Sequence, residues 1–178
     1  METNNVIEPT KISNSVHAPE YAPVKENEQV LLALGITADH IAALPMIVNT
    51  GNTFLLLEAR NEEVLQKLQP DMNGLRQLAQ QYDLSGYCIF IREKDRVDAT
   101  ALMFGTLPDM AAEASGKLGA GALACYLYDI AMIKKELAVI REGFPVSPQQ
   151  ERTLQIRLIL EQGKIQSWQP ESSITQAQ

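Results

Sequence analysis

The stretch from Leu118 to Ile133, LGAGALACYLYDIAMI, limits the possible folds of this chain more than any other part of the sequence. Its only charged side chain is Asp129, so a helix here has no polar stripe wide enough to face water. A helix that is apolar on every side is buried on every side. Its sixteen residues, at about 1.5 Å each, make a rod of roughly 24 Å. This is too short for a membrane span, which needs about 20 apolar residues, so we predict a helix enclosed by a curved sheet.

Composition excludes several classes of partner. The 178 residues suffice for one well-cored domain. The net charge of −7 argues against a nucleic-acid or membrane partner, because both surfaces attract clustered lysine and arginine. Cys88 and Cys125 lie in apolar runs with no Cys/His partner nearby, which indicates reduced core residues of a cytoplasmic protein. We expect no metal and no cofactor, and we expect no secretion because no basic-then-apolar leader opens the sequence.

Local patterns predict a short first helix, a hairpin and two further helices before the buried one. The first helix begins near Gln29 and ends at Gly35, because glycine readily takes the left-handed conformation of a helix end. Residues 49–52, NTGN, supply a hairpin turn. Asn61 and Asp71 precede the next two helices. We expect strands at residues 46–48, 53–57, 86–92, 97–104, 137–142, 152–160 and 164–168.

This order of elements predicts an α+β fold, because strands and helices do not alternate as they do in a doubly wound sheet. We expect a mixed or mostly antiparallel sheet, curled as a half-barrel around one buried central helix. Residues 1–28 contain three prolines and no apolar period, so we predict a flexible N-terminal arm, whose second half can order against the body of the protein. The folded lobe should span residues 29–168, and the polar residues 169–178 should form a flexible tail.

Three stretches of the sequence carry family-like motifs in a fixed order. The first, residues 31–79, contains V-N-T-G-N-T-F-L-L-L and then L-Q-P-D. The second, residues 99–127, contains M-F-G-T-L-P and ends in G-A-G-A-L-A-C-Y-L. The third, residues 138–160, reads AVIREGFPVSPQQERTLQIRLIL. Together they resemble the C-terminal half of the PhzF-type isomerases, relatives of diaminopimelate epimerase, and none resembles the N-terminal half.

The resemblance implies one lobe of a diaminopimelate epimerase-like fold. In that family two similar halves, each a curled sheet around a central helix, enclose the active site between them. The chemistry implied is proton transfer at a carbon, as in the isomerisation of a dihydro-hydroxyanthranilate, with a glutamate of the N-terminal half as acid/base. Such work needs a carboxylate within hydrogen-bond reach of the moving proton. It also needs helix-start N–H groups that hold a substrate carboxylate.

The family's site motif can be placed on this sequence at the start of the buried helix. Aligned without gaps over residues 121–127, the family's acidic residue falls on Glu113, the candidate catalytic residue. The Thr-Gly-Ser anion cradle falls on Gly116, Lys117 and Leu118, and a slip of one residue places Ser115 and Gly116 on Thr-Gly instead. We therefore name Ser115, Gly116 and Lys117 as candidate carboxylate-binding residues. In the structural alternative, Ser115 is an ordinary helix cap and Lys117 is solvated.

Other positions depart from the family pattern. The arginine before Met-Phe is Leu102 here, and the region of Gly-Arg-Pro-Ser reads PVSP at residues 145–148. The N-terminal half and its glutamate have no counterpart.

A charged Asp129 is energetically costly inside an apolar helix. We therefore expect its side chain to bond to a backbone group or an arginine, or to be exposed at the helix end.

Two functional hypotheses of different class follow. In the first, the lobe completes an active site with a separately encoded partner lobe or as a homodimer, and acts as an isomerase on a small carboxylate. In the second, the lobe is a non-catalytic module that uses the face left by the missing half to bind a protein partner or a small ligand.

Overall fold

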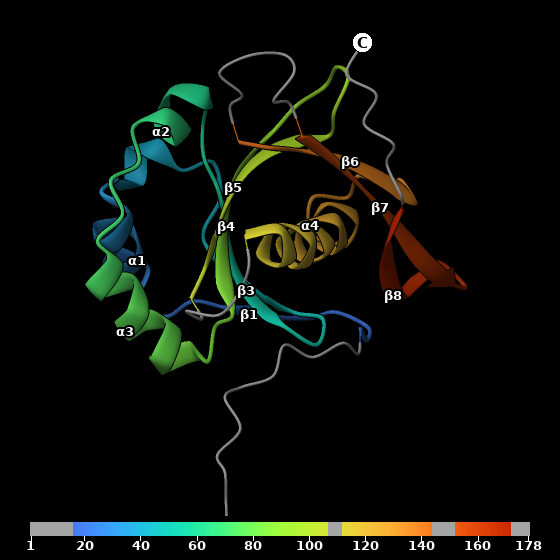
Figure 1. Cartoon of the computed structure of the whole chain (residues 1–178), viewed down its shortest axis with the longest axis horizontal. Helices are drawn as coiled ribbons and strands as arrows, with labels where there is room; N and C mark the ends of the chain where they lie inside the picture. Colours follow the sequence, from blue (N-terminus) through green and yellow to red (C-terminus); the bar gives the residue numbers. More distant parts are fainter. Residues whose placement is uncertain (1–15, 107–111, 144–151, 172–178) are drawn as a thin grey trace, which may run out of the picture.

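One eight-stranded mixed sheet curls around a single long helix, with three shorter helices on its outer side (Figure 1). The computed structural model describes residues 16–106, 112–143 and 152–171, and only the backbone of 112–114. The elements are β1 (Glu20–Pro23), α1 (Asn27–Leu34), a 3-10 turn (Ala38–His40), β2 (Met46–Asn49), β3 (Thr53–Glu58), α2 (Glu62–Gln66), α3 (Met72–Tyr82), β4 (Gly86–Arg92), β5 (Ala99–Gly105), α4 (Ala112–Asp129), β6 (Leu137–Glu142), β7 (Arg152–Glu161) and β8 (Lys164–Glu171).

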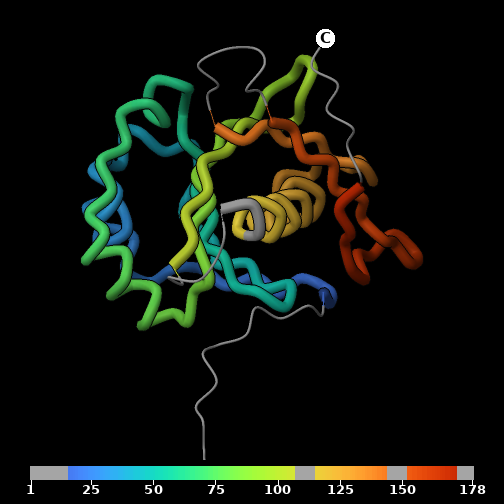
Figure 2. The backbone as a smooth tube through the Cα atoms, in the orientation of Figure 1, coloured from blue at the N-terminus to red at the C-terminus, as the bar shows by residue number. Residues whose placement is uncertain are grey.

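The strands lie in the sheet in the order of the chain, from β1 to β8. All neighbours are antiparallel except β3–β4 and β5–β6, which are parallel. Each parallel pair is joined by a helical crossover: α2 and α3 connect β3 to β4, and α4 connects β5 to β6. The predicted α+β class and the mixed sheet are confirmed. The sheet is open, with β1 at one edge and β8 at the other (Figure 2).

The helix α4 lies on the concave side of the sheet (Figure 1). Its 18 residues make a rod of about 27 Å. Every residue from Gly119 to Tyr128 is buried, and Ala120, Ala122, Leu123 and Cys125 have no exposed surface at all. Side chains of seven strands, β2 to β8, join α4 in one apolar cluster. Residues 119–128 of α4 are apolar all round because side chains from seven strands pack around them.

The strands β3 and β4 are apolar without alternation because both faces of the sheet are covered there. Phe54 and Leu56 of β3 face the α4 cluster. Leu55 and Leu57 belong to a second cluster that includes α1, α2 and α3. Two caps of this outer layer are found as expected: Asn61 accepts the Val64 N–H at 3.1 Å, and Gly35 takes the left-handed conformation. The two layers fix β3 and β4 in the centre of the molecule.

Two hydrogen bonds close the curled sheet over α4. Trp168 of β8 donates its indole N–H to the hydroxyl of Thr50, in the β2–β3 turn, at 3.0 Å. Tyr21 of β1 donates to Asp129 Oδ2, 2.6 Å away, and lies 3.0 Å from the Cys125 carbonyl oxygen. Asp129 is thus bound by a tyrosine from the first strand. Asp129 is the half-buried last residue of α4, and its described partner is a tyrosine and not an arginine or a backbone group. Sequence spacing gives no sign of a contact across 108 residues.

Regular secondary structure is present within the ranges expected to form the arm and the tail. The range predicted as an arm contains β1, which pairs with β2, and α1 starts within it at Asn27. The range predicted as a tail contains the last residues of β8, up to Glu171. Residues 1–15 and 172–178 lie outside the described part of the chain. Among the described helices, none is long and apolar enough to cross a bilayer.

The close contact of α4 with Trp168 generates a prediction for Gly121. A Cβ atom added at Gly121 would lie 2.0 Å from Cε2 of the Trp168 ring, which is buried and cannot withdraw. We expect Gly121→Ala to lower the free energy of unfolding by about 1–3 kcal/mol through overpacking, despite the gain of about 1 kcal/mol in helix propensity. Urea denaturation followed by circular dichroism measures this change.

Gly116→Ala is the matched control in the same helix. The Cβ atom there meets the end of the flexible Glu142 side chain, which can move away. The free energy of unfolding should therefore stay near that of the parent chain. Equal destabilisation by both substitutions would contradict the packing of α4 against Trp168.

Candidate functional site

The predicted site residues lie at the N-terminal end of α4, which begins at Ala112. Glu113 is in the first turn, and its side chain is outside the described part of the structure, so its role as acid/base stays a prediction. Ser115 is buried, with 4% of its surface exposed, whereas Lys117 is exposed. Backbone N–H groups in the first turn of a helix lack partners within the helix and carry partial positive charge. This end of α4 can therefore attract an anion.

An anionic side chain of the protein itself lies at this end of the helix. Glu142, the last residue of β6, directs its carboxylate at Gly116: a Cβ atom added there would lie 1.9 Å from Glu142 Oε1 and 3.0 Å from its Cδ. Glu142 also lies 3.8 Å from Arg152 at the start of β7, and the two residues are 20% and 61% exposed. Glu142 was missed by the sequence analysis.

One of the stretches aligned with a family motif lies outside the described residues. The stretch PVSP at 145–148, which stands where the family has Gly-Arg-Pro-Ser, is not part of the described structure. Leu102, in place of the family's arginine, is half-buried in β5 and packs against the outer cluster. The site at the start of α4 therefore combines helix N–H groups, the small Gly116, the exposed Lys117 and the Glu142 carboxylate.

The opposite end of α4 holds ionisable groups that are unsuited to chemistry at neutral pH. Burial raises the pKa of Cys125 from 9.0 to about 12. Burial, and then the hydrogen bond to Asp129, raise the pKa of the Tyr21 hydroxyl far above its usual range. Burial also raises the pKa of Cys88. A nucleophilic cysteine must be a thiolate, so neither thiol fits that role and both are core residues, free of disulfides.

A cavity of about 650 Å³ lies in the outer layer, away from α4, between the end of α1 and α2. His40 lines it and serves a structural purpose there, because its Nδ1 accepts the Thr37 backbone N–H at 3.0 Å. Lys67 and Glu63 form an exposed ion pair, with a distance of 2.6 Å, on the same wall. The hydrogen bond from Lys67, and after it the positive charge of Lys67, lower the pKa of Glu63. None of the predicted site residues borders this cavity.

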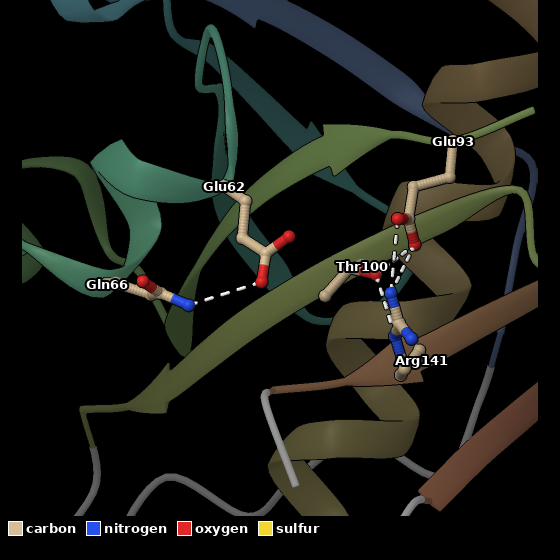
Figure 3. A network of polar contacts seen from close by, with 5 residues as sticks. All are labelled: Glu62, Gln66, Glu93, Thr100 and Arg141. Carbon is tan, nitrogen blue, oxygen red and sulfur yellow. Dashed lines mark hydrogen bonds and ion pairs between the residues drawn. The ribbon is translucent and has the colours of Figure 1, made fainter.

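A polar network ties β5 and β6 together on the outer face of the sheet (Figure 3). Arg141 points at Glu93 and Thr100, with its Nε 3.0 Å from the Thr100 hydroxyl and a terminal nitrogen 2.8 Å from Glu93 Oε2. Thr100 donates in turn to Glu93. The charges and donors of the three side chains satisfy one another, which indicates a structural role. Within the described residues, no group of three or more His, Cys, Asp or Glu side chains could hold a metal ion.

Comparison with known proteins identifies the fold. No family model and no curated protein matches the sequence. A PhzF family phenazine biosynthesis protein from Bacillus anthracis superposes with a TM-score of 0.65 at 12% identity, over 86% of this chain and 54% of that one. A predicted epimerase from Pseudomonas aeruginosa gives a TM-score of 0.55 at 16% identity, over 88% of this chain and 55% of that one.

The chain thus spans about half the length of these two proteins. The resemblance to PhzF-type proteins seen in the sequence is confirmed in the fold. At such low identity the comparison concerns the arrangement of helices and strands, because one fold can carry many functions.

The burial of Cys125 predicts how stability depends on pH. Its pKa is raised from 9.0 to about 12 in the folded chain, so between these values the unfolded chain has lost a proton that the folded chain keeps. Stability is then lost as pH rises above the unfolded value, by up to about 1.4 kcal/mol per pH unit for each such group. We expect Cys125→Ala to make this alkaline loss shallower by up to that amount, measured by urea denaturation across the range.

The measured quantity is the slope of the free energy of unfolding against pH. A substitution that destabilises the protein equally at every pH does not change this slope. Cys88→Ala should give a similar effect, because burial raises the pKa of that thiol too. A slope identical in the parent chain and in both variants would contradict the burial of the thiols.

Proposed function

We propose that this chain is a single lobe of a diaminopimelate epimerase-like fold, equivalent to the C-terminal half of the PhzF-type proteins, and that it works on small carboxylated molecules in association with a second lobe. The observation that carries the proposal is the burial of residues 119–128 of α4 within a curled sheet, in a chain that superposes on about half of a PhzF family protein. The second lobe is another copy of this chain or a separately encoded partner.

The need for a second lobe follows from the chemistry expected at the start of α4. Glu113, Ser115, Gly116 and Lys117 lie together in two successive turns of one helix. Proton transfer at carbon uses a positioned acid/base within hydrogen-bond reach of the substrate, and the resemblance places that group in the other half. A lobe with only the binding end of the site requires a partner to supply the rest.

The position of Glu142 favours a second candidate function, a non-catalytic module that binds a protein partner or a small ligand. Its carboxylate lies against Gly116, in the region where the substrate carboxylate would be held. The altered cradle residues, Lys117 and Leu118 in place of Gly-Ser, point in the same direction. In this alternative the lobe binds a partner or ligand but does not catalyse proton transfer.

Both candidate functions predict association. Size-exclusion chromatography with light scattering should show a dimer at micromolar concentration, or a complex when the product of a neighbouring gene is added. A chain that stays monomeric alone and with such candidates would contradict both functions.

The two functions differ in proton exchange. If the lobe is catalytic, the associated form should incorporate solvent deuterium into a small carboxylated substrate, and Glu113→Gln and Lys117→Ala should each lower the rate by about 100-fold or more. Glu161→Gln and Lys164→Ala, exposed substitutions in the β7–β8 hairpin, are the matched controls and should leave the rate unchanged. Ligand binding without any exchange in the parent chain would select the non-catalytic module.

A further inference from the structure

The outer-layer cavity of about 650 Å³ is framed by two chain segments that are joined to each other at both ends. One segment is the end of α1 with the 3-10 turn that follows it, and the other contains α2 (Figure 1). The Gln69 backbone N–H donates to the Leu34 carbonyl oxygen at 3.1 Å, and the Arg60 N–H donates to the His40 carbonyl oxygen at 2.9 Å. Because these bonds fix both ends of the frame, the space between the segments is preformed, as in most small-molecule sites.

The lining of this cavity combines apolar and charged side chains. Ile36, Val64 and Leu68 supply apolar surface from both segments. Glu63 and Lys67 supply a carboxylate and an ammonium group 2.6 Å apart, and these two side chains are 67% and 71% exposed. The volume lies within the range of about 300–1,000 Å³ that is usual for ligand pockets. The cavity therefore has room for a molecule of amino-acid size, and its charged groups are accessible from solvent.

The acidic and basic groups of the lining balance each other. Apart from His40, the lining contains one acidic side chain, Glu63, and one basic side chain, Lys67. A ligand with a single charge meets one attractive and one repulsive group there, whereas a zwitterion can pair with both. Separating the exposed Glu63–Lys67 pair costs little, because exposed ion pairs contribute little to stability. The pair can therefore exchange its internal contact for contacts with a zwitterion.

His40 adds a hydrogen-bond donor to the same lining. Its Nδ1 accepts the Thr37 backbone N–H at 3.0 Å. A neutral imidazole that accepts at Nδ1 carries its hydrogen on Nε2, so the other ring nitrogen of His40 is a donor. The bond to Thr37 also holds the ring against the 3-10 turn. A carboxylate in the cavity thus has two donors available, His40 and Lys67.

We propose that this cavity binds a zwitterionic α-amino acid with an aliphatic side chain. Lys67 and His40 bind its carboxylate, Glu63 binds its ammonium group, and its side chain packs on Val64 and Leu68. The site lies in the outer layer, away from the start of α4, and its existence does not depend on the proposed function.

The test uses L-leucine as the probe and two analogues that each lack one charge. Binding to the 15N-labelled full-length chain is followed by NMR, through the amide signals of residues 61–69. The first analogue, 4-methylpentanoate, lacks the ammonium group, and the second, 3-methylbutylamine, lacks the carboxylate. Each analogue loses one ionic contact and leaves one charge of the lining unmatched, so its Kd should exceed that of leucine by at least about fivefold.

Two substitutions assign the charges of the ligand to their partners. Lys67→Gln should raise the Kd of leucine about two- to fivefold, as expected for one exposed ion pair, without raising the Kd of 3-methylbutylamine. Glu63→Gln should raise the Kd of leucine by a similar factor without raising that of 4-methylpentanoate. A substitution that only damaged the local structure would weaken the binding of all three ligands alike.

Glu62→Gln and Lys164→Gln are the matched controls. Glu62 is the exposed carboxylate next to Glu63 in α2, bonds to Gln66 and is not part of the cavity lining. Lys164 is an exposed lysine at the start of β8. Both variants should bind leucine with the Kd of the parent chain.

Three outcomes would overturn the inference. The first is that leucine, up to its solubility limit, leaves the amides of residues 61–69 unshifted. The second is that leucine and both analogues bind with the same Kd, because the charged groups would then take no part. The third is that leucine shifts residues 115–118 instead, which would support the carboxylate site of the proposed function and refute the outer-layer site. Failure of the outer-layer site therefore leaves the proposed function open to its own test.

Discussion

A helix without a polar face must be covered on every side before it is stable in water, and this requirement governs the rest of the structure. A second helix can cover only one flank of α4, whereas a curled sheet reaches around it. The strands β2 to β8 do this, and each contributes side chains to the same apolar cluster. The glycines of α4 allow the close approach, most clearly at Gly121, where the Trp168 ring takes the space of a side chain. The curvature of the sheet is thus a consequence of what it encloses.

A curled sheet leaves an outer face that also needs covering where its strands are apolar. The outward residues of β3 and β4, such as Leu55 and Ile89, are covered by α1, α2 and α3. Among the described residues, no helix covers the outer side of β6, β7 and β8, where Arg141 and Arg157 lie. The central strands β3 and β4 are therefore apolar along most of their length, whereas apolar and polar residues alternate in β7.

Features that depend on neighbouring residues could be predicted from the sequence. The buried helix, the hairpin at residues 49–52 and the caps at Gly35 and Asn61 follow from local composition and spacing, and all were found. The helix bounds differ, because α4 spans Ala112–Asp129 and not residues 118–133. Contacts between distant parts of the chain could not be predicted in this way. Tyr21 reaches Asp129 from a segment expected to be flexible, because a four-residue strand such as β1 has too few residues to show a period.

The candidate site also contains residues that the sequence pattern could locate and one residue that it could not. The motif placed Ser115, Gly116 and Lys117 at the opening of the helix, whereas α4 begins at Ala112, so they are its fourth to sixth residues and Ser115 is not its N-cap. Glu142 was missed because it is the last residue of a strand that follows α4, and only the parallel crossover from β5 to β6 brings it back to the helix start. The sequence around Glu142 contains no pattern that indicates its proximity to Gly116.

The hydrogen bond from Trp168 to Thr50 joins residues 118 positions apart in the chain. Since β8 completes the cover over α4, the helix cannot be fully buried until this strand has joined the sheet. Contacts between residues so far apart in the chain are slow to form, because the loop between them must close first. A fold that depends on such a contact is expected to fold more slowly than a helical bundle of the same length.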